Sequence, residues 1–359
     1  MSTSRGTLVV QDLITFIRRY VVLSPAQLLV TSLWVVHSHA VDAAESSPYL
    51  AVTSPEPGCG KTRYLEVLEM VVARPWLAVT PSEAVVYRRI EALVPTLLMD
   101  EVDAVFSPKV AERHEGLRAL LNSGNRRGAT VPRCLGTSAE IVEFHTFCPK
   151  VLAGIGTLPD TISSRSVPIR LERRTKNQEL EVFRRRDVEP AGEKLRDRIE
   201  VWAARHETAL AAARPDMPQQ MSDRMQDGCE PLLAIADVLH LGSQARKALL
   251  ALLTAVRLDS QETMQLTLLR DVHSVLNGHR SISSRALLTR LHQLEEAPWS
   301  TYYGRSLDER DLARLLHPYG IKSKVVRVKL SGGLSKTVKG YSRDDLHPVF
   351  ERYVGPDDA

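Results

Sequence analysis

The stretch that decides the fold is Ser54-Pro-Glu-Pro-Gly-Cys-Gly-Lys61-Thr62. It follows an apolar run over 49–53 that is typical of a buried strand, and it precedes Leu65, Leu68 and Val72 at helical spacing. In the order strand, glycine-bearing turn, Gly-Lys-Thr and helix, backbone N–H groups can surround phosphate oxygens at the positive end of the helix. The stretch therefore predicts a phosphate-binding loop.

Each residue type in this loop has a physical task. Gly58 and Gly60 let the backbone turn so that its N–H groups point inward. Lys61 would reach the β- and γ-phosphates of ATP, and the Thr62 hydroxyl would hold Mg²⁺. Pro55 stands where the usual pattern opens with glycine, and the alternative is a glycine turn with an incidental Lys-Thr pair. The residues expected to contact the nucleotide are Pro57, Gly58, Cys59, Gly60, Lys61, Thr62 and Arg63.

The run Thr96-Leu-Leu-Met-Asp100-Glu101 supplies the other half of such a site. It predicts a buried strand that delivers two acids at its carboxyl end. Asp100 would hold Mg²⁺ through its water shell, and Glu101 would polarise the water that attacks the γ-phosphate. Taken alone, the run is also compatible with an ordinary strand that ends in an acidic turn. Together with Gly-Lys-Thr, it predicts ATP hydrolysis.

Composition bounds the rest of the molecule. A chain of 359 residues predicts two or three domains, and a net charge of +4 permits nucleic-acid binding without requiring it. The four cysteines show no Cys-x-x-Cys spacing, which argues against a zinc site or a disulfide framework and favours a reducing cytoplasm. The apolar segment Pro25–Val36 is short and contains Gln27 and Thr31, so we expect a buried helix and no membrane partner.

The C-terminal part predicts a winged helix-turn-helix. Helical patterns over 283–294 and 308–317, the second opened by the capping box Ser306-Leu-Asp-Glu309, precede two strands over 321–329 and 336–341. Such a module binds duplex DNA, although winged helices also serve as protein-interaction modules. The basic residues expected on its DNA face are Arg310, Arg314, Lys322, Lys324, Arg327, Lys329, Lys336 and Lys339.

A strand over 150–156 is followed by Thr157-Leu-Pro-Asp-Thr-Ile-Ser-Ser-Arg165-Ser and a last strand over 167–171. This order resembles the AAA+ and superfamily 3 branch of P-loop ATPases. The resemblance implies that Arg165 is an arginine finger, which completes the active site of a neighbouring subunit. The sensor strand departs from the family, because Gly154 and Gly156 stand where Asn or Thr is usual, and this leaves Thr157 as the candidate sensor.

The turn Ser123-Gly-Asn-Arg-Arg127-Gly and the two strand patterns after it form an insert. In ring ATPases such inserts often project into the central channel, where Arg126, Arg127 and Arg133 would track the phosphate backbone of single-stranded DNA. The alternatives are that these arginines pair with neighbouring acids or contact nucleotide across a subunit interface.

A narrower resemblance rests on the motifs Arg126-Arg-Gly-Ala-Thr-Val, Ala153-Gly-Ile-Gly-x-Leu-Pro-Asp-Thr and Ser164-Arg-Ser-Val-Pro-Ile-Arg-Leu. They look like those of a family of uncharacterised P-loop proteins of phages and mobile elements, often joined to primase modules. The resemblance covers nearly all of the chain beyond residue 20. It implies a homo-oligomeric ring, a hexamer, with a primase or other replication proteins as partners.

The resemblance also implies a helical lid over the nucleotide, formed by 176–260. In that lid Arg224 would act as a second sensor arginine that contacts the nucleotide, unless it forms a surface pair with Asp227. The expected domains are an N-terminal helical brace (1–44), an α/β P-loop core of the AAA+ type with a parallel sheet (45–175), the lid (176–260) and the winged helix (261–359). Charged residues alternate over 177–213, which predicts a solvated helix.

The function expected from these features is that of a ring-forming, ATP-dependent DNA helicase or DNA motor of a phage or mobile element. The alternative is an ATP-switched DNA-binding initiator, loader or regulator that does not translocate. A degenerate P-loop protein with a scaffolding role is disfavoured, because Lys61, Thr62, Asp100 and Glu101 are all present.

Overall fold

The computed structural model describes residues 3–79, 81–106, 115–135, 140–156, 158–175, 177–259, 264–294, 297–300, 302, 305–329 and 335–354. The chain folds as two compact units, Met1–Asp259 and Ser260–Ala359, which we call unit 1 and unit 2. Within the described segments, none of the helices combines the length and the apolar composition that crossing a bilayer requires.

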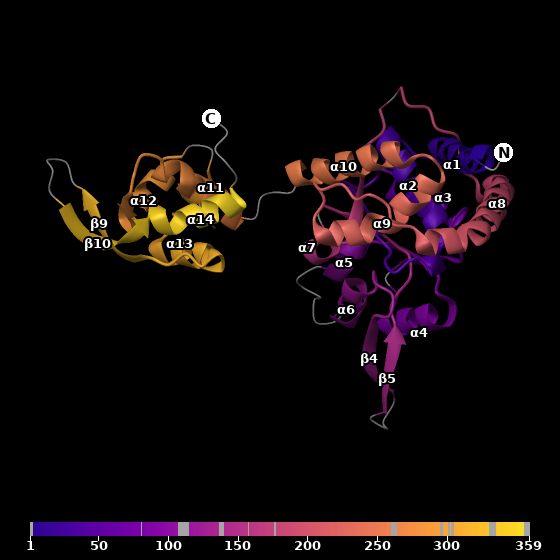
Figure 1. Ribbon diagram of the computed structural model, residues 1–359, viewed down its shortest axis with the longest axis horizontal. Coiled ribbons are helices and arrows are strands. Elements are labelled where there is room, and N and C mark those ends of the chain that lie inside the picture. The colour runs from indigo at the N-terminus through magenta and orange to yellow at the C-terminus, as the bar shows by residue number, and fades with distance from the viewer. Residues whose placement is uncertain are drawn as a thin grey trace. The chain divides into compact units, whose positions relative to one another are not determined.

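Unit 1 is an α/β structure built on one central sheet (Figure 1). Its strands are β1 (Tyr49–Ser54), β2 (Pro75–Val79), β3 (Thr96–Asp100), β4 (Thr130–Leu135), β5 (Glu140–His145), β6 (Lys150–Ile155) and β7 (Ser166–Arg170). Its helices are α1 (Thr3–Arg18), α2 (Pro25–His39), α3 (Lys61–Glu69), α4 (Glu83–Leu93), α5 (Val102–Phe106), α6 (Glu115–Ser123), α7 (Asp160–Ser163), α8 (Arg185–Ala212), α9 (Asp223–Val238) and α10 (Gly242–Asp259).

The central sheet has the strand order β2-β3-β6-β1-β7, and every neighbouring pair is parallel. In the register, Leu50 of β1 stands opposite Val151 of β6 on one side and Val167 of β7 on the other. The predicted parallel α/β sheet is thus confirmed. Because parallel strands run the same way, the ends of β1, β3 and β6 lie along one edge of the sheet, and their beginnings lie along the opposite edge.

Alternate residues of β1 face opposite sides of the sheet, as the period of two in a strand requires. Leu50 and Val52 join a core formed with α1, α2, α3, α8, α9 and α10. Tyr49 and Ala51 join a second core, formed with α4, α5, α6 and α7. With both faces covered, the strands can be apolar throughout, and this explains the nearly unbroken apolar runs of the sequence.

The expected brace and lid are not separate layers. One core is shared by α3, one face of the sheet and five further helices. Two of these helices, α1 and α2, precede the sheet in the sequence, and the other three, α8, α9 and α10, follow it. Helices α9 and α10 pack against α2, and α10 also contacts β7. The helices predicted as a lid are therefore part of the core of unit 1, and their position over the nucleotide stays a prediction.

Helix α2 begins with a capping box that holds it to the sheet. The Ser24 hydroxyl accepts from the Gln27 N–H at 3.2 Å, and the Gln27 side-chain oxygen accepts from the Ser24 N–H at 2.8 Å. The Gln27 side-chain amide then donates to the carbonyl of Arg170 at 2.7 Å. One side chain therefore sets both the start of α2 and its distance from β7.

Strands β4 and β5 form an antiparallel hairpin outside the central sheet, with Thr130 opposite His145. Figure 1 shows this hairpin projecting away from the rest of unit 1. The turn that contains Arg126 and Arg127 lies at the base of the hairpin, before β4 begins. The strands that follow these two arginines extend the chain beyond them.

Unit 2 consists of α11 (Met264–Leu276), β8 (Ser281–Ser283), α12 (Ser284–Leu291), α13 (Glu309–Leu316), β9 (Lys324–Lys329), β10 (Ser335–Ser342) and α14 (Arg343–Tyr353). Its antiparallel sheet has the order β8-β10-β9. The close approach of β8 requires a glycine at position 340, because a Cβ there would lie 2.1 Å from the carbonyl oxygen of Ile282. Trp299, Leu312, Leu316 and Tyr341 are among the buried residues of a core that draws only on this unit.

The start of α13 differs from the capping box expected at Ser306. Asp308 is the N-cap, and its carboxylate accepts from the N–H groups of Arg310 at 2.9 Å and Asp311 at 2.8 Å. The Ser306 hydroxyl instead donates to the carbonyl of Ser300. Aspartate and serine are both good N-cap residues, so the pattern alone could not decide between them.

Candidate functional site

The loop between β1 and α3 is built around two glycines in the left-handed region. Gly58 has φ 78° and Gly60, the N-cap of α3, has φ 94°, and only glycine adopts such angles at little cost. A Cβ added at either position would meet nothing within 4 Å. The space beside both glycines is therefore open, and α3 begins there with the N–H groups of its first turn, which can meet an anion.

Lys61 and Thr62 extend from the first turn of α3 toward the strand ends. The Lys61 ammonium donates to the Ser54 hydroxyl at 2.6 Å, and this hydroxyl donates to the carbonyl of Glu56 at 2.7 Å. The Thr62 hydroxyl donates to a carboxylate oxygen of Asp100 at 2.8 Å. Two motifs that stand far apart in the sequence thus meet through one hydrogen bond.

The second acid of the pair is held in an unusual backbone conformation. Glu101 has φ 56°, an angle that non-glycine residues rarely adopt, and its N–H donates to the other carboxylate oxygen of Asp100 at 2.9 Å. Asp100 itself is buried, with 8% of its surface exposed, whereas Glu101 is exposed. The positive φ follows directly after β3 and turns the chain there, so Glu101 sits at the edge of the sheet beside Asp100.

A third acid, Asp103, joins this edge, and sequence analysis missed it. Its carboxylate accepts from the N–H of Ile155 at 3.1 Å, which ties the start of α5 to the end of β6. Gly154 makes the approach possible, because a Cβ there would lie 2.9 Å from the same carboxylate oxygen. The glycine that replaces the usual sensor residue thus gives room to Asp103. The candidate sensor Thr157 lies outside the described residues.

The other residues of the predicted nucleotide contact set are placed as follows. Pro57 is exposed and Cys59 is half-buried in the loop. Arg63 stacks on the ring of Phe183, with its guanidinium carbon 4.4 Å from the ring centroid, and pairs with Glu66 at 3.0 Å. The side chain of Arg63 is thus held beside Phe183 and Glu66.

Arg165 and Arg224 lie at the opposite edge of the sheet. The carbonyl of Arg165 accepts from the N–H of Tyr49, the first residue of β1, whereas the loop follows Ser54, the last. Strand β1 has six residues and spans about 17 Å. The guanidinium of Arg224 donates to the hydroxyl of Ser164 at 3.1 Å. Arg224 thus lies at the edge of the sheet opposite the loop, where α9 packs against α2, and its contact with the nucleotide stays a prediction.

The charges at this far edge are mostly positive. The Arg165 guanidinium donates to the carbonyl of Thr161, and burial together with the nearby guanidinium of Arg224 lowers the pKa of Arg165. Arg126 also lies near and pairs with Asp227 at 2.6 Å. Asp227 therefore pairs with Arg126 and not with Arg224, the surface pair that the sequence left open.

The two remaining arginines of the insert have partners in the same chain. Arg127 donates to the carbonyls of Val41 at 2.8 Å and Ala44 at 2.9 Å, and stacks on Phe147. Arg133, on β4, pairs with Glu83 at 3.0 Å and donates to the Tyr87 hydroxyl. With the pairs Arg126–Asp227 and Arg127–Asp42, these contacts favour the alternative in which the arginines pair with neighbouring acids.

In unit 2, α13 buries one side and exposes the other. Leu312, Leu315 and Leu316 are buried, whereas Arg310 and Arg314 are exposed. Ala313 and His317 complete the outward face at the i, i+3, i+4, i+7 spacing of one helix side. That face carries no acid, and none occurs anywhere from 312 to 343.

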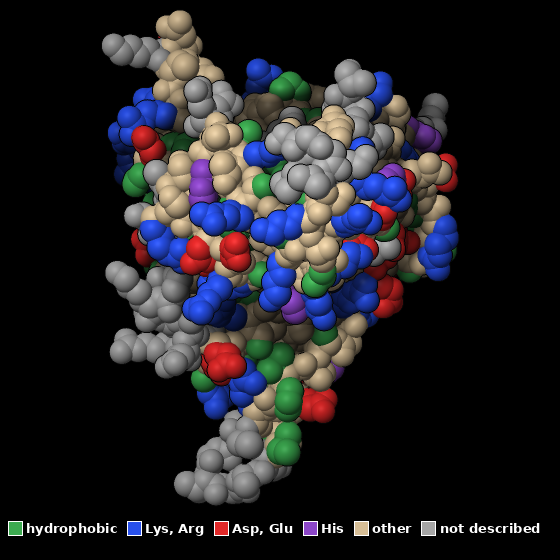
Figure 2. Space-filling view, turned by 90° about the vertical axis from the view of Figure 1, so that its left-hand side faces the viewer, with side chains coloured by type: hydrophobic (Ala, Val, Ile, Leu, Met, Phe, Trp, Pro, Cys, Tyr) green, Lys and Arg blue, Asp and Glu red, His purple; other side chains and the backbone are tan. Residues whose placement is uncertain are grey.

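The strands after α13 add further positive charge. The exposed basic side chains near and on β9 and β10 are Lys322, Lys324, Arg327, Lys336 and Lys339. Lys324 is partly neutralised by Asp345 at 2.5 Å, and the side chain of Lys329 lies outside the described residues. Figure 2 shows a face of the molecule on which Lys and Arg side chains gather. Such a surface attracts phosphate backbones.

The residues at the loop edge fit a magnesium nucleotide. The Thr62 hydroxyl and the Asp100 carboxylate offer the hard oxygen ligands that Mg²⁺ takes, and they lie within one hydrogen bond of each other. The open side of the loop leaves space for phosphates beside Lys61. Among the described residues, no group of three or more His, Cys, Asp or Glu side chains forms a metal site.

Comparison with known proteins adds the following. A family described as proteins of unknown function, DUF3631, matches residues 170–353. The chain is 30% identical over 187 residues to an uncharacterized 28.9 kDa protein in the xis 5' region of Saccharopolyspora erythraea, covering 51% of this chain and 68% of that protein. It is similar to two apo structures of the NrS-1 C terminal region, each at 12% identity, covering 94% of this chain and 75% of those chains, with TM-scores of 0.47 and 0.46. The family match covers more than half of the chain, so the chain belongs to the DUF3631 family.

Proposed function

We propose that the chain is a P-loop ATPase of the AAA+ type that works on DNA as an oligomeric motor, with unit 2 as a winged-helix DNA-binding domain. The observation that carries the proposal is the hydrogen bond from Thr62 to Asp100, with Lys61 and Glu101 beside it at one edge of the sheet. This bond brings the glycine-Lys-Thr motif and the acidic motif, which stand far apart in the sequence, to one edge of the sheet.

Each group at the loop edge has a task in hydrolysis. The loop N–H groups and Lys61 would bind the β- and γ-phosphates, and Thr62 and Asp100 would hold Mg²⁺, which offsets phosphate charge. Glu101, exposed and aimed by its positive φ, would take a proton from the attacking water. Because Glu101 is exposed and Asp100 is buried, Glu101 can reach a water molecule that Asp100 cannot.

Arg165 cannot reach the loop of its own chain, because the length of β1 separates them. We infer that it stabilises the γ-phosphate held by a neighbouring copy, which makes hydrolysis depend on assembly. A ring of copies, a hexamer by the resemblance of the motifs, would place each Arg165 at the next loop. A primase or another replication protein would act beside this motor.

The test is ATP turnover by wild-type protein and by Glu101→Gln, with and without single-stranded and duplex DNA. Glu101→Gln should lose turnover by about 100-fold or more, since general-base catalysis contributes that much, and should still assemble with ATP. Assembly is followed by light scattering after size exclusion. The matched control is Glu179→Gln, an exposed acid elsewhere in unit 1, which should leave turnover unchanged. Wild-type protein that does not hydrolyse ATP would refute the proposal.

A second candidate is an ATP-switched DNA-binding protein that does not translocate. The intrachain partners of Arg126, Arg127 and Arg133 favour it, because a translocating pore needs cations that are available to DNA. Strand displacement separates the two candidates. A motor unwinds a tailed duplex and loses this activity in Arg133→Ala with duplex binding intact. A switch binds duplex in an ATP-dependent way and displaces no strand.

A further inference from the structure

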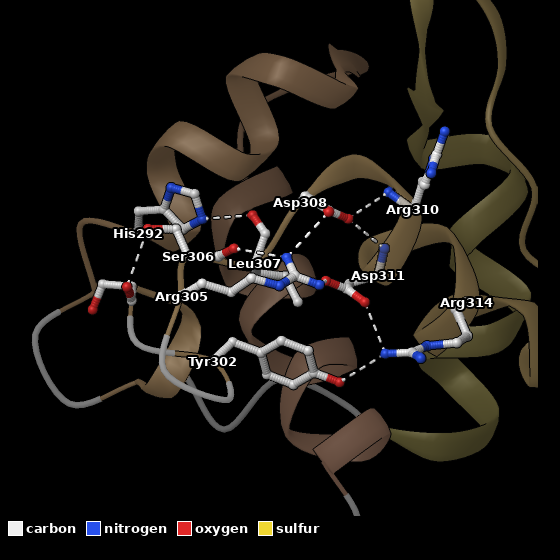
Figure 3. A network of polar contacts seen from close by, with 10 residues as sticks. His292, Tyr302, Arg305, Ser306, Leu307, Asp308, Arg310, Asp311 and Arg314 are labelled. Atoms are coloured by element: carbon white, nitrogen blue, oxygen red, sulfur yellow. Dashed lines mark hydrogen bonds and ion pairs between the residues drawn. The ribbon is translucent and has the colours of Figure 1, made fainter.

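The two arginines on the outward face of α13 are held in different ways (Figure 3). Arg314 donates through Nη2 to the Asp311 carboxylate at 2.8 Å and to the Tyr302 hydroxyl at 3.4 Å. The guanidinium of Arg310 makes no hydrogen bond or ion pair with any described residue, and Figure 3 shows it pointing away from the network. One arginine is oriented before any ligand arrives, and the other is free to move.

Asp311 is a rigid anchor for Arg314. Its side chain is only 7% exposed, and its second carboxylate oxygen accepts from Nη2 of Arg305 at 2.5 Å. Arg305 also pairs with Asp308, the N-cap of α13, at 3.1 Å. Both oxygens of Asp311 are therefore engaged from opposite sides, which fixes the carboxylate plane and with it the guanidinium that it holds.

The charges of this network cancel. Arg305 pairs with Asp308 and with Asp311, and Arg314 pairs with Asp311, so two positive charges face two negative charges. A neutral network adds little to the attraction of phosphates, which depends on net positive charge. The side chain of Arg314 is nevertheless 67% exposed, and its Nη1 and Nε make no contact with a described residue. Its orientation is thus the property that the network provides.

An oriented, exposed guanidinium on the outward side of a helix matches one base edge. Arginine donates two parallel hydrogen bonds to O6 and N7 of guanine in the major groove, a geometry that lysine cannot reproduce. An arginine already held in place also loses less side-chain freedom on binding. A phosphate contact needs no such preparation, because it depends on charge more than on direction.

We propose that Arg314 reads a guanine in duplex DNA, that Asp311 positions it, and that Arg310 contacts the phosphate backbone. This inference rests on the proposed binding of DNA by unit 2 and deepens it: the substrate is a particular duplex sequence that contains guanine. The protein would then be directed to a site, and its ATPase would act where unit 2 has bound.

The experiment is selection of binding sites from a random duplex library by the full chain, followed by affinity measurements on the selected site. For wild-type protein, replacing the guanine read by Arg314 should weaken binding by roughly 5- to 150-fold. Arg314→Lys keeps the charge, so its affinity for random duplex and its salt dependence should stay within about 2-fold of wild type, while the guanine preference is lost. Asp311→Asn should weaken the same preference with Arg314 still present.

Arg285→Lys is the matched control, since it makes the same change at an exposed arginine of α12 that has no part in the proposed DNA contact. It should select the wild-type site. The inference is overturned if wild-type protein binds duplex without base preference, or if Arg314→Lys selects the same site as wild type and Arg285→Lys. Absence of any duplex binding by wild-type protein would instead refute the proposed function of unit 2. Circular dichroism confirms that each variant is folded.

Discussion

At the scale of single residues, a buried polar group is stable when it has a hydrogen-bonding partner, and a buried charge is costly. This rule applies to the candidate site and to the buried histidine His37. Thr62 and Asp100 satisfy each other, whereas His37 is fully buried with Nε2 2.9 Å from the Ser47 hydroxyl. The Nδ1 atom of His37 has no hydrogen-bonding partner among the described residues. Burial disfavours the charged imidazolium, and it lowers the pKa of His37 to about 4.

This pKa predicts a loss of stability in mild acid. The unfolded chain binds a proton on His37 near pH 6.5 and the folded chain near pH 4, so the unfolded state holds more protons between these values. The free energy of unfolding should therefore fall as the pH falls through that window, by about 2 kcal/mol between pH 7 and pH 5. Urea unfolding followed by circular dichroism measures it.

The comparison that isolates His37 uses two variants. His37→Gln should remove this part of the pH dependence, whereas His145→Gln, at an exposed histidine, should retain it. If the free energy of unfolding depends on pH equally in wild type and His37→Gln, the pKa of His37 is not lowered in the folded protein.

At the scale of elements, Lys150 joins the start of β6 to the turn after α6, at the edge of the sheet opposite the loop. Lys150 is fully buried, and none of its hydrogen-bonding partners among the described residues is a carboxylate. Its ammonium donates to the carbonyls of Gly124 at 2.9 Å, Thr146 at 2.9 Å and Cys148 at 3.0 Å. Burial lowers the pKa of Lys150, and these three acceptors compensate for the water it has lost.

Lys150→Met should therefore destabilise unit 1. Methionine has a similar length and removes the donor that three buried carbonyls share, at an expected cost of about 3 kcal/mol. Thermal or urea unfolding measures the loss, and Lys194→Met on the exposed side of α8 is the control, with an expected change within about 0.5 kcal/mol. If Lys150→Met is as stable as wild type, desolvation of the ammonium cancels its hydrogen bonds.

At the scale of the whole molecule, the chain separates into two units that each bury their own core. The core of unit 2 is formed by residues of that unit alone, among them Leu268, Trp299, Leu312 and Phe350. Unit 1 contains the loop edge, and unit 2 contains the outward face of α13. Nucleotide and duplex DNA are therefore expected to bind to different units, so that each of these two activities can be tested by itself.

A fragment of residues 260–359 should fold without unit 1. Since its core is complete, it should show helical circular dichroism and one cooperative urea transition, and it should bind duplex DNA in a salt-dependent way. The complementary fragment, 1–259, should hydrolyse ATP without stimulation by duplex DNA. An unfolded or aggregated 260–359 fragment would show that the units stabilise each other. Duplex stimulation of 1–259 would place a DNA contact in unit 1.

The sequence alone was enough for the local features. The apolar runs and the glycine-Lys-Thr order predicted β1, the turn and α3. These elements could be predicted because an apolar strand and a glycine turn are recognised from residues that are close in the sequence. The edge at which Lys61, Thr62 and Asp100 meet also followed, since parallel strands bring their carboxyl ends together. The approach of Asp103 to β6 did not, because it depends on the space left by Gly154 in a neighbouring strand.

What only the tertiary structure decided is where the helices and arginines lie. An amphipathic pattern states that α9 has a face to bury and says nothing of which surface will cover it, so the sequence placed Arg224 near the nucleotide, and packing against α2 placed it at the far edge. The partners of Arg127, Arg133 and Arg314 belong to other turns or elements. A charge is a property of the sequence, but whether it is paired, oriented or free depends on what the fold brings within hydrogen-bonding distance.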